Sequence, residues 1–162
     1  LDLTNVETLI QQYDVVVDCS DNFPTRYLIN DACTLAGIPF SHGAILRFEG
    51  QITTFEANKG GPCYRCLFRS APAPGTVPDC ATAGVLGVLP GTVGTIQATE
   101  TIKLLINHGE TLDGRFLVYD AEEMFFEEFP VTPRSDCPVC QKGGVESIHD
   151  VSYESSCSIQ LD

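Results

Sequence analysis

The chain has 162 residues, 43% of them apolar, a length and composition typical of one globular domain. Its formal net charge is −13, from 22 acidic and 9 basic side chains, which argues against nucleic acid as a partner because phosphate binding needs clustered Lys and Arg. No apolar run predicts a membrane span, and the N-terminus shows no signal-like pattern. We therefore expect a single domain over residues 1–162, in the cytoplasm, that binds neither nucleic acid nor membrane.

The first forty residues alternate helical and strand patterns. Residues 3–12 carry apolar side chains at intervals of three and four, which predicts an amphipathic helix. Residues 14–19 (DVVVDC) are a short β-branched run typical of a buried parallel strand. A helix is then predicted from Pro24 to Gly37, followed by a strand over 38–42. This order predicts a βαβ unit, and so an α/β fold with a parallel strand pair.

Asp21 and Asn22 follow the first predicted strand directly. Ligands of open α/β sheets bind beyond the carboxyl ends of the strands, so both side chains are candidates for ligand binding. Either one can instead cap the next helix, because Asp and Asn oxygens accept the free amides of a first helical turn. The residues alone leave both roles open.

Later segments predict antiparallel strands and one long helix. Residues 44–57 alternate, with a break at Glu49–Gly50 that predicts a turn or bulge between two antiparallel strands. Residues 115–120 and 124–129 predict a hairpin, so the whole sheet should be mixed. Residues 145–162, which include Cys157, have no strong period and predict a short extension or tail.

The long helix is predicted over residues 93–107, with Thr92 as its cap. The side chains expected to face inward are those of Val93, Ile96, Ile102, Leu105 and Ile106. A second set of small residues makes one face smooth enough for close helix packing within or between subunits: Gly91, Gly94, Thr95, Ala98 and Thr99.

Four of the eight cysteines form two Cys-x-x-Cys pairs, Cys63 with Cys66 and Cys137 with Cys140. Four thiolates are the number that a closed tetrahedral zinc site requires. The pairs lie farther apart than in a zinc ribbon, so the fold must bring them together. Disulfides or a dithiol redox centre are alternatives, although the missing signal pattern disfavours a secreted disulfide protein.

Several motifs together resemble the C-terminal half of the MoeB/ThiF family, bacterial relatives of the ubiquitin-activating enzymes. These motifs are CSDN at 19–22, PFSHGAILRFEGQITTF at 39–55, both Cys-x-x-Cys pairs, Cys80, and GVLGVLPGTVGTIQATETIKLL at 84–105. The resemblance extends over about residues 6–140. It implies a Rossmann-like fold with a mixed sheet, flanking helices and a four-cysteine zinc site.

The resemblance also implies a function, which is the ATP-dependent adenylation of the C-terminal glycine of a ubiquitin-like sulfur carrier protein. Asp21 corresponds to the aspartate that holds magnesium at the ATP phosphates, and Asn22 lies beside the nucleotide. Cys80 corresponds to the cysteine that, in some members, takes the activated carboxyl group in thioester formation or sulfur transfer. The four paired cysteines correspond to the ligands of a structural zinc. Homodimers are the family expectation.

One departure from the family pattern affects these expectations. The family's Gly-rich phosphate loop and first strands lie upstream of the position of Asp21 and have no match here. We therefore expect the chain to be a fragment that lacks the ATP-phosphate-binding half and binds ATP poorly by itself. The alternative function is a zinc-stapled, non-catalytic module for dimerisation and carrier binding. Family members serve molybdopterin, thiamine, tRNA-thiolation and cysteine pathways, and no residue decides among these.

Overall fold

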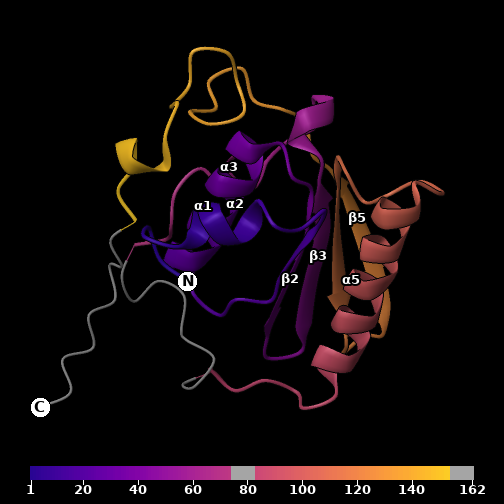
Figure 1. The fold of residues 1–162 in the computed structure, drawn as a ribbon. Coiled ribbons are helices and arrows are strands. Elements are labelled where there is room, and N and C mark those ends of the chain that lie inside the picture. The colour runs from indigo at the N-terminus through magenta and orange to yellow at the C-terminus, as the bar shows by residue number, and fades with distance from the viewer. Residues whose placement is uncertain (74–82, 154–162) are drawn as a thin grey trace, which may run out of the picture.

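A five-stranded mixed sheet forms the centre of the computed structural model, which describes residues 1–73 and 83–153 (Figure 1). The strands are β1 (Val16–Asp18), β2 (Phe40–Leu46), β3 (Glu49–Phe55), β4 (Arg115–Asp120) and β5 (Phe125–Pro130), and they lie side by side in chain order. β1 and β2 are parallel and all other neighbours are antiparallel. The predicted parallel pair and mixed sheet are confirmed.

Helices cover both faces of this sheet (Figure 1). They are α1 (Val6–Ile10), α2 (Phe23–Ala36), α3 (Tyr64–Leu67) and α5 (Leu89–Ile106), with short 3-10 turns η1 (Ala57–Lys59) and η2 (Ile148–Asp150). One hydrophobic cluster joins α1, α2 and α3 to Phe40 and Phe55, and a second joins α5 to Ile52 and Tyr119. No helix in the described ranges is long and apolar enough to cross a bilayer.

The turn between β2 and β3 corrects one prediction. It lies at Arg47 and Phe48, where Arg47 has a left-handed φ of 53°, and Glu49 and Gly50 belong to the strand that follows. An added Cβ at Gly50 would lie 2.6 Å from Cγ2 of Val93 on α5. The glycine therefore permits close approach of a helix to the sheet, and it is not a turn residue.

Helix α5 corrects a second prediction. It begins at Leu89, with Pro90 in its first turn, so Thr92 is not its cap. Val93 is buried and Ile96 packs against the same cluster, as predicted. The remaining three residues predicted to face inward are exposed, namely Ile102, Leu105 and Ile106.

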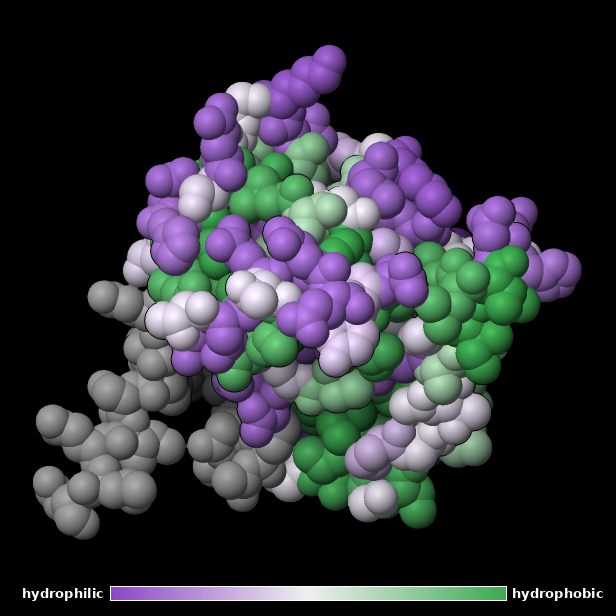
Figure 2. All heavy atoms as spheres, viewed as in Figure 1, coloured by the Kyte–Doolittle hydropathy of each residue, from purple (hydrophilic) through white to green (hydrophobic). Residues whose placement is uncertain are grey.

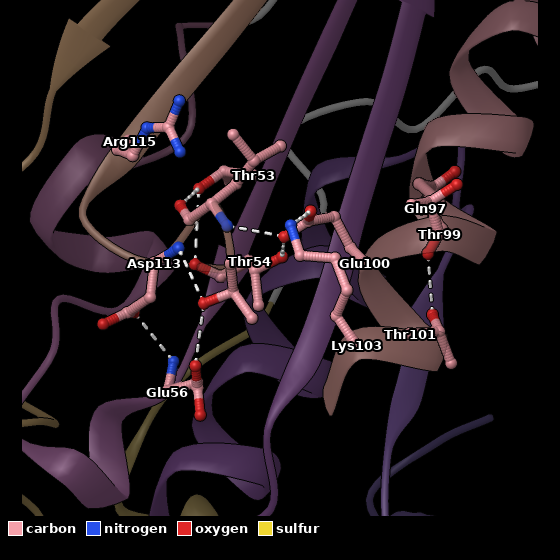
Figure 3. Close-up of polar contacts among 12 residues, drawn as sticks. Thr53, Thr54, Glu56, Gln97, Thr99, Glu100, Thr101, Lys103, Asp113 and Arg115 are labelled. Atoms are coloured by element: carbon pink, nitrogen blue, oxygen red, sulfur yellow. Dashed lines mark hydrogen bonds and ion pairs between the residues drawn. The ribbon is translucent and has the colours of Figure 1, made fainter. Parts of the chain in front are cut away.

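Two polar side chains decide which face of α5 meets the sheet. Glu100 is buried, and its Oε2 accepts hydrogen bonds from Thr54 Oγ1 at 2.9 Å and from the Leu112 amide at 2.5 Å (Figure 3). Gln97 is also buried, and an added Cβ at Gly43 would lie 2.3 Å from its Oε1. Because buried polar groups need partners, these two residues help to fix which face of the helix meets the sheet, together with the buried Leu89 and Val93.

The segment predicted as a tail is partly built into the core. Ile148 in η2 is fully buried in the cluster around α1 and α2, and Tyr153 packs against that cluster. The Tyr153 hydroxyl donates to Oδ2 of Asp31 on α2 at 2.7 Å. The tail prediction is therefore wrong for 145–153, and Cys157 lies outside the described residues.

The net charge of −13 predicts a stability that increases with salt. Like charges on a compact chain repel one another, and raising KCl from 0.1 to 1 M shortens the screening length from about 10 Å to about 3 Å. We expect the Tm, measured by circular dichroism, to rise by several degrees over this range. Chloride is preferable to sulfate, which also strengthens apolar burial. A Tm that is constant or falls with KCl would contradict this account.

Candidate functional site

The two Cys-x-x-Cys pairs meet in space. Their Sγ atoms all lie within 4.8 Å of one another. Individual Sγ···Sγ distances are 4.0 Å for Cys63–Cys66, 3.5 Å for Cys63–Cys137 and 3.4 Å for Cys66–Cys140. A tetrahedral zinc site with Zn–S bonds of about 2.3 Å has sulfur–sulfur edges of about 3.8 Å. The donor set and its spacing therefore fit a four-thiolate zinc site.

Short local structures hold each pair. Cys63 is the N-cap residue of α3 and Cys66 lies within that helix, so its first turn brings the two thiols together. The second pair lies in a loop closed by the hydrogen bond from the Val145 amide to the Pro138 carbonyl, at 2.7 Å. Cys63, Cys66 and Cys137 are buried, and the four protein sulfurs leave no position for a substrate. Such a closed site is structural in character.

The thiols influence one another's protonation. Hydrogen bonds with Cys137 and Cys63 hold the pKa of Cys66 below its usual value. Hydrogen bonds with Cys137 and Cys66, together with burial, raise the pKa of Cys63, and burial raises that of Cys140 to about 12. Metal binding must displace the remaining thiol protons, so zinc affinity should fall as the pH falls.

Asp21 and Asn22 lie at the carboxyl end of β1, as predicted, but have different environments. Asn22 is the N-cap of α2, and its Oδ1 accepts from the Thr25 amide at 2.9 Å. Asp21 is exposed, and its one hydrogen-bond partner among the described residues is Nδ2 of Asn22, at 3.1 Å. An exposed carboxylate at a strand end, with one oxygen that accepts no hydrogen bond from the described residues, fits a hard cation such as magnesium.

A buried pair behind this loop was missed by reasoning from sequence. Asp18, the last residue of β1, lies 2.7 Å from the ring of His42 on β2, measured from Oδ2 to Nδ1. Both side chains are almost completely buried. The available signal was an aspartate inside a β-branched strand, where a carboxylate needs a partner.

Aromatic packing connects this pair to the cysteine cluster. The His42 ring lies edge-on to Tyr64, with ring centroids 4.9 Å apart. Tyr64 lies between Cys63 and Cys66 in α3, and its amide donates to Oδ1 of Asn30 at 2.7 Å. The cysteine cluster and the strand end that bears Asp21 thus share one packed layer. Cys80 lies outside the described residues.

A pocket of about 380 Å³ lies elsewhere, at the C-terminal end of α5, and contains none of the predicted site residues. Its cations already have carboxylate partners: Lys59 pairs with Glu56, Lys103 with Glu100 (Figure 3), and Arg115 with Glu128. Because these cations are already paired, the pocket offers little net attraction to a phosphate. It is not a candidate nucleotide site.

The fold and the four-cysteine cluster define the class of protein. The ThiF family profile matches residues 1–139, and the chain belongs to the ThiF family. The SAMP-activating enzyme E1 of Haloferax volcanii is 63% identical to it over 162 residues, which are 100% of this chain and 59% of that protein. The sulfur carrier protein adenylyltransferase of Thermus thermophilus is 46% identical over 160 residues, or 96% of this chain and 59% of that protein.

The solved structures agree with this fold assignment. The crystal structure of E. coli MccB matches with a TM-score of 0.69 and 17% identity, over 90% of this chain and 45% of that chain. At this identity the likeness shows the fold alone. The chain spans 59% of the length of the two relatives compared above.

Proposed function

We propose that the full-length protein adenylates the C-terminal glycine of a ubiquitin-like sulfur carrier protein, using ATP and magnesium. The observation that carries the proposal is the Asp21 carboxylate, which is exposed after the carboxyl end of β1 and bonded there only to the neighbouring Asn22 among the described residues. Two relatives similar over at least 96% of this chain, named as a SAMP-activating enzyme and a sulfur carrier adenylyltransferase, support this choice of reaction.

In this reaction the carrier's terminal carboxylate attacks the α-phosphorus of ATP, which forms an acyl-adenylate and releases pyrophosphate. Magnesium would neutralise phosphate charge, and Asp21 is the residue that would hold it. Asn22 keeps the N-terminus of α2 in place beside Asp21, through its cap to the Thr25 amide. The four cysteines would hold zinc for structure only, at a site closed to substrates.

We further propose that Cys80 acts after adenylation. Its thiolate would attack the acyl-adenylate carbonyl, so that a thioester forms and AMP leaves with the electron pair of the broken C–O bond. The described cysteines are all free thiols, which suits a reducing cytoplasm.

Weak ATP binding by the 162-residue chain alone stays a prediction.

The role of Asp21 can be tested in the full-length protein with its carrier. Asp21→Ala should lower carrier-dependent ATP–pyrophosphate exchange by about 100-fold or more, because a bound cation contributes several kcal/mol of charge stabilisation. Asp14→Ala, which removes another exposed carboxylate near β1, is the matched control and should retain exchange. Cys80→Ala should also retain exchange but lose the carrier thioester.

Three outcomes decide between the functions. Unchanged exchange in Asp21→Ala would contradict the role of this residue. Carrier binding by the wild-type protein without any exchange would favour the non-catalytic module. Exchange that requires Asp21 supports the adenylation reaction.

We also propose that the protein is a homodimer through the outer face of α5. Ile102, Leu105 and Ile106 form exposed apolar surface over the C-terminal part of this helix (Figure 2), and added Cβ atoms at Gly91 and Gly94 would meet nothing within 4 Å. A second copy of a chain with a net charge of −13 would dock best through an uncharged face such as this one. Small residues also permit close approach of the partner helix.

The dimer proposal predicts a change in sedimentation. Leu105→Glu should convert the full-length protein to a monomer at micromolar concentration, because it would place two carboxylates in an apolar contact. Tyr13→Glu, at an exposed position away from α5, is the control that should remain dimeric. A wild-type protein that sediments as a monomer would rule the dimer out.

A further inference from the structure

The loop between β1 and α2 is held by a buried carboxylate. Asp18 Oδ2 lies 2.7 Å from His42 Nδ1, and Asp18 Oδ1 accepts from the Ser20 amide at 3.0 Å and the Ser20 hydroxyl at 2.6 Å. Asp18 and His42 are direct neighbours in the parallel pairing of β1 with β2. One carboxylate therefore connects both strands to the loop that carries Asp21.

Two more elements hold the same backbone. Arg26 on α2 donates to the Ser20 carbonyl through Nε at 3.2 Å and Nη2 at 2.9 Å. Gln97 on α5 donates from Nε2 to the Asp18 carbonyl at 3.0 Å. Asp21 thus lies between two fixed neighbours, since Ser20 is bonded on one side and the cap residue Asn22 on the other.

The Asp18 carboxylate is charged despite its burial. Desolvation opposes ionisation, but the hydrogen bonds from His42 and Ser20 outweigh it, so the pKa of Asp18 is below its usual value. Because an ionised carboxylate only accepts hydrogen bonds, His42 must carry its proton on Nδ1. The Tyr64 ring packs edge-on to the imidazole and restricts its rotation.

Stability alone does not account for this arrangement. A buried ionic pair often contributes no more to stability than an apolar pair of similar volume, because desolvation offsets the attraction. An apolar pair, however, could not bond the Ser20 amide and hydroxyl. What the polar pair adds is a fixed backbone conformation immediately before Asp21.

We propose that Asp18 and His42 are positioning residues, whose hydrogen bond holds Ser20 and thereby orients the Asp21 carboxylate toward the magnesium of bound ATP. This inference rests on the function proposed above. Supporting partners behind a metal ligand commonly change metal affinity or activity by about 10- to 100-fold when they are removed. A loss of this size is expected here.

The test uses the full-length protein and two substitutions of His42. His42→Phe keeps a ring against Tyr64 but removes the donor, and His42→Asn keeps a nitrogen donor near the Nδ1 position. We expect His42→Phe to weaken Mg·ATP binding, measured by calorimetry without carrier, by about 10-fold or more. The kcat of pyrophosphate exchange should fall as well, with the KM for carrier unchanged. His42→Asn should retain most of the wild-type Mg·ATP affinity and most of the wild-type kcat.

Two further variants separate positioning from stability. Phe55 lies in the hydrophobic cluster that contains Tyr64, and its side chain makes no hydrogen bond to the loop. Phe55→Leu should therefore lower the Tm without weakening Mg·ATP binding. Ser20→Ala removes one side-chain hydrogen bond at a half-buried position and should weaken Mg·ATP binding by about fivefold, which provides a readout if His42→Phe does not fold.

The outcomes distinguish this inference from the proposed function. If the wild-type protein binds Mg·ATP and neither His42→Phe nor Ser20→Ala weakens that binding, the positioning role is wrong and the adenylation proposal stands. If Phe55→Leu weakened Mg·ATP binding as much as His42→Phe does, the positioning role would also be wrong. If binding depends on His42 but no exchange occurs with carrier, the positioning role stands and the adenylation proposal fails. A wild-type protein that binds no Mg·ATP would overturn both.

Discussion

Cys63→Ser is expected to abolish stoichiometric zinc binding and the cooperative folding of the domain. Cys63 is the most buried residue of the cluster and lies close to both Cys66 and Cys137. Structural zinc sites bind with about 10–16 kcal/mol, comparable with the whole stability of a typical domain, about 5–15 kcal/mol. The measurements are the metal content of the purified protein and its thermal unfolding followed by circular dichroism.

Controls for the zinc prediction use the other cysteines and the pH. Cys19→Ser changes a residue outside the cluster and keeps a donor for its hydrogen bond to Oε1 of Gln97, so it should keep one zinc per chain with a normal Tm. Zinc should be lost as the pH is lowered, because protons compete for the four thiolates. A Cys63→Ser protein with full zinc content, or a wild-type protein with reversible disulfides and no metal, would contradict the site. The second result would favour the dithiol redox alternative.

Asp31→Ala is expected to lower the free energy of unfolding by about 3–5 kcal/mol, because it leaves a largely buried guanidinium without its partner. Asp31 has no exposed side-chain surface and binds Arg65 through two hydrogen bonds of 2.7 Å each. It also accepts from the hydroxyl of Tyr153, and Arg65 lies 4.7 Å from the centroid of Tyr27. For a domain of this size, the Tm should fall by roughly 10 °C or more.

The matched control for Asp31 is an exposed pair of the same chemistry. Arg115 binds Glu128 through two hydrogen bonds across β4 and β5, where both side chains are over 40% exposed. Glu128→Ala should therefore leave the Tm almost unchanged. Equal decreases in Tm for Asp31→Ala and Glu128→Ala would show that burial of the Asp31–Arg65 pair does not affect its contribution to stability.

Local patterns in the sequence predicted the parts of the protein that depend on spacing. The β-branched run before Cys19 and the helix that ends at Gly37 predicted the parallel pair of β1 and β2. The two Cys-x-x-Cys pairs predicted a cluster of four thiols that could hold zinc, because a one-turn spacing already brings each pair of thiols together. The position of Asp21 after a strand predicted its place at the edge of the sheet.

Other features could not be read from spacing because more than one arrangement satisfies the same pattern. Helix α5 is apolar on two faces, since Val93 lies on one and Leu105 on the other. On the buried face, Gln97 and Glu100 make hydrogen bonds whose partners lie on strands distant in the sequence. Likewise, glycine is common in turns, and only the close approach of Val93 shows why a glycine stands at position 50 within a strand.

The sequence by itself thus determined the order of the elements, the two Cys-x-x-Cys pairs and the location of Asp21 after a strand, since each depends on neighbours in the chain. That the two cysteine pairs meet was decided by the tertiary structure. The tertiary structure alone decided which face of α5 is buried, that Ile148 enters the core, and that Asp18 meets His42. The physical reason is that a buried polar group needs hydrogen-bond partners and a buried apolar group needs packing partners. Those partners come from segments far away in the sequence.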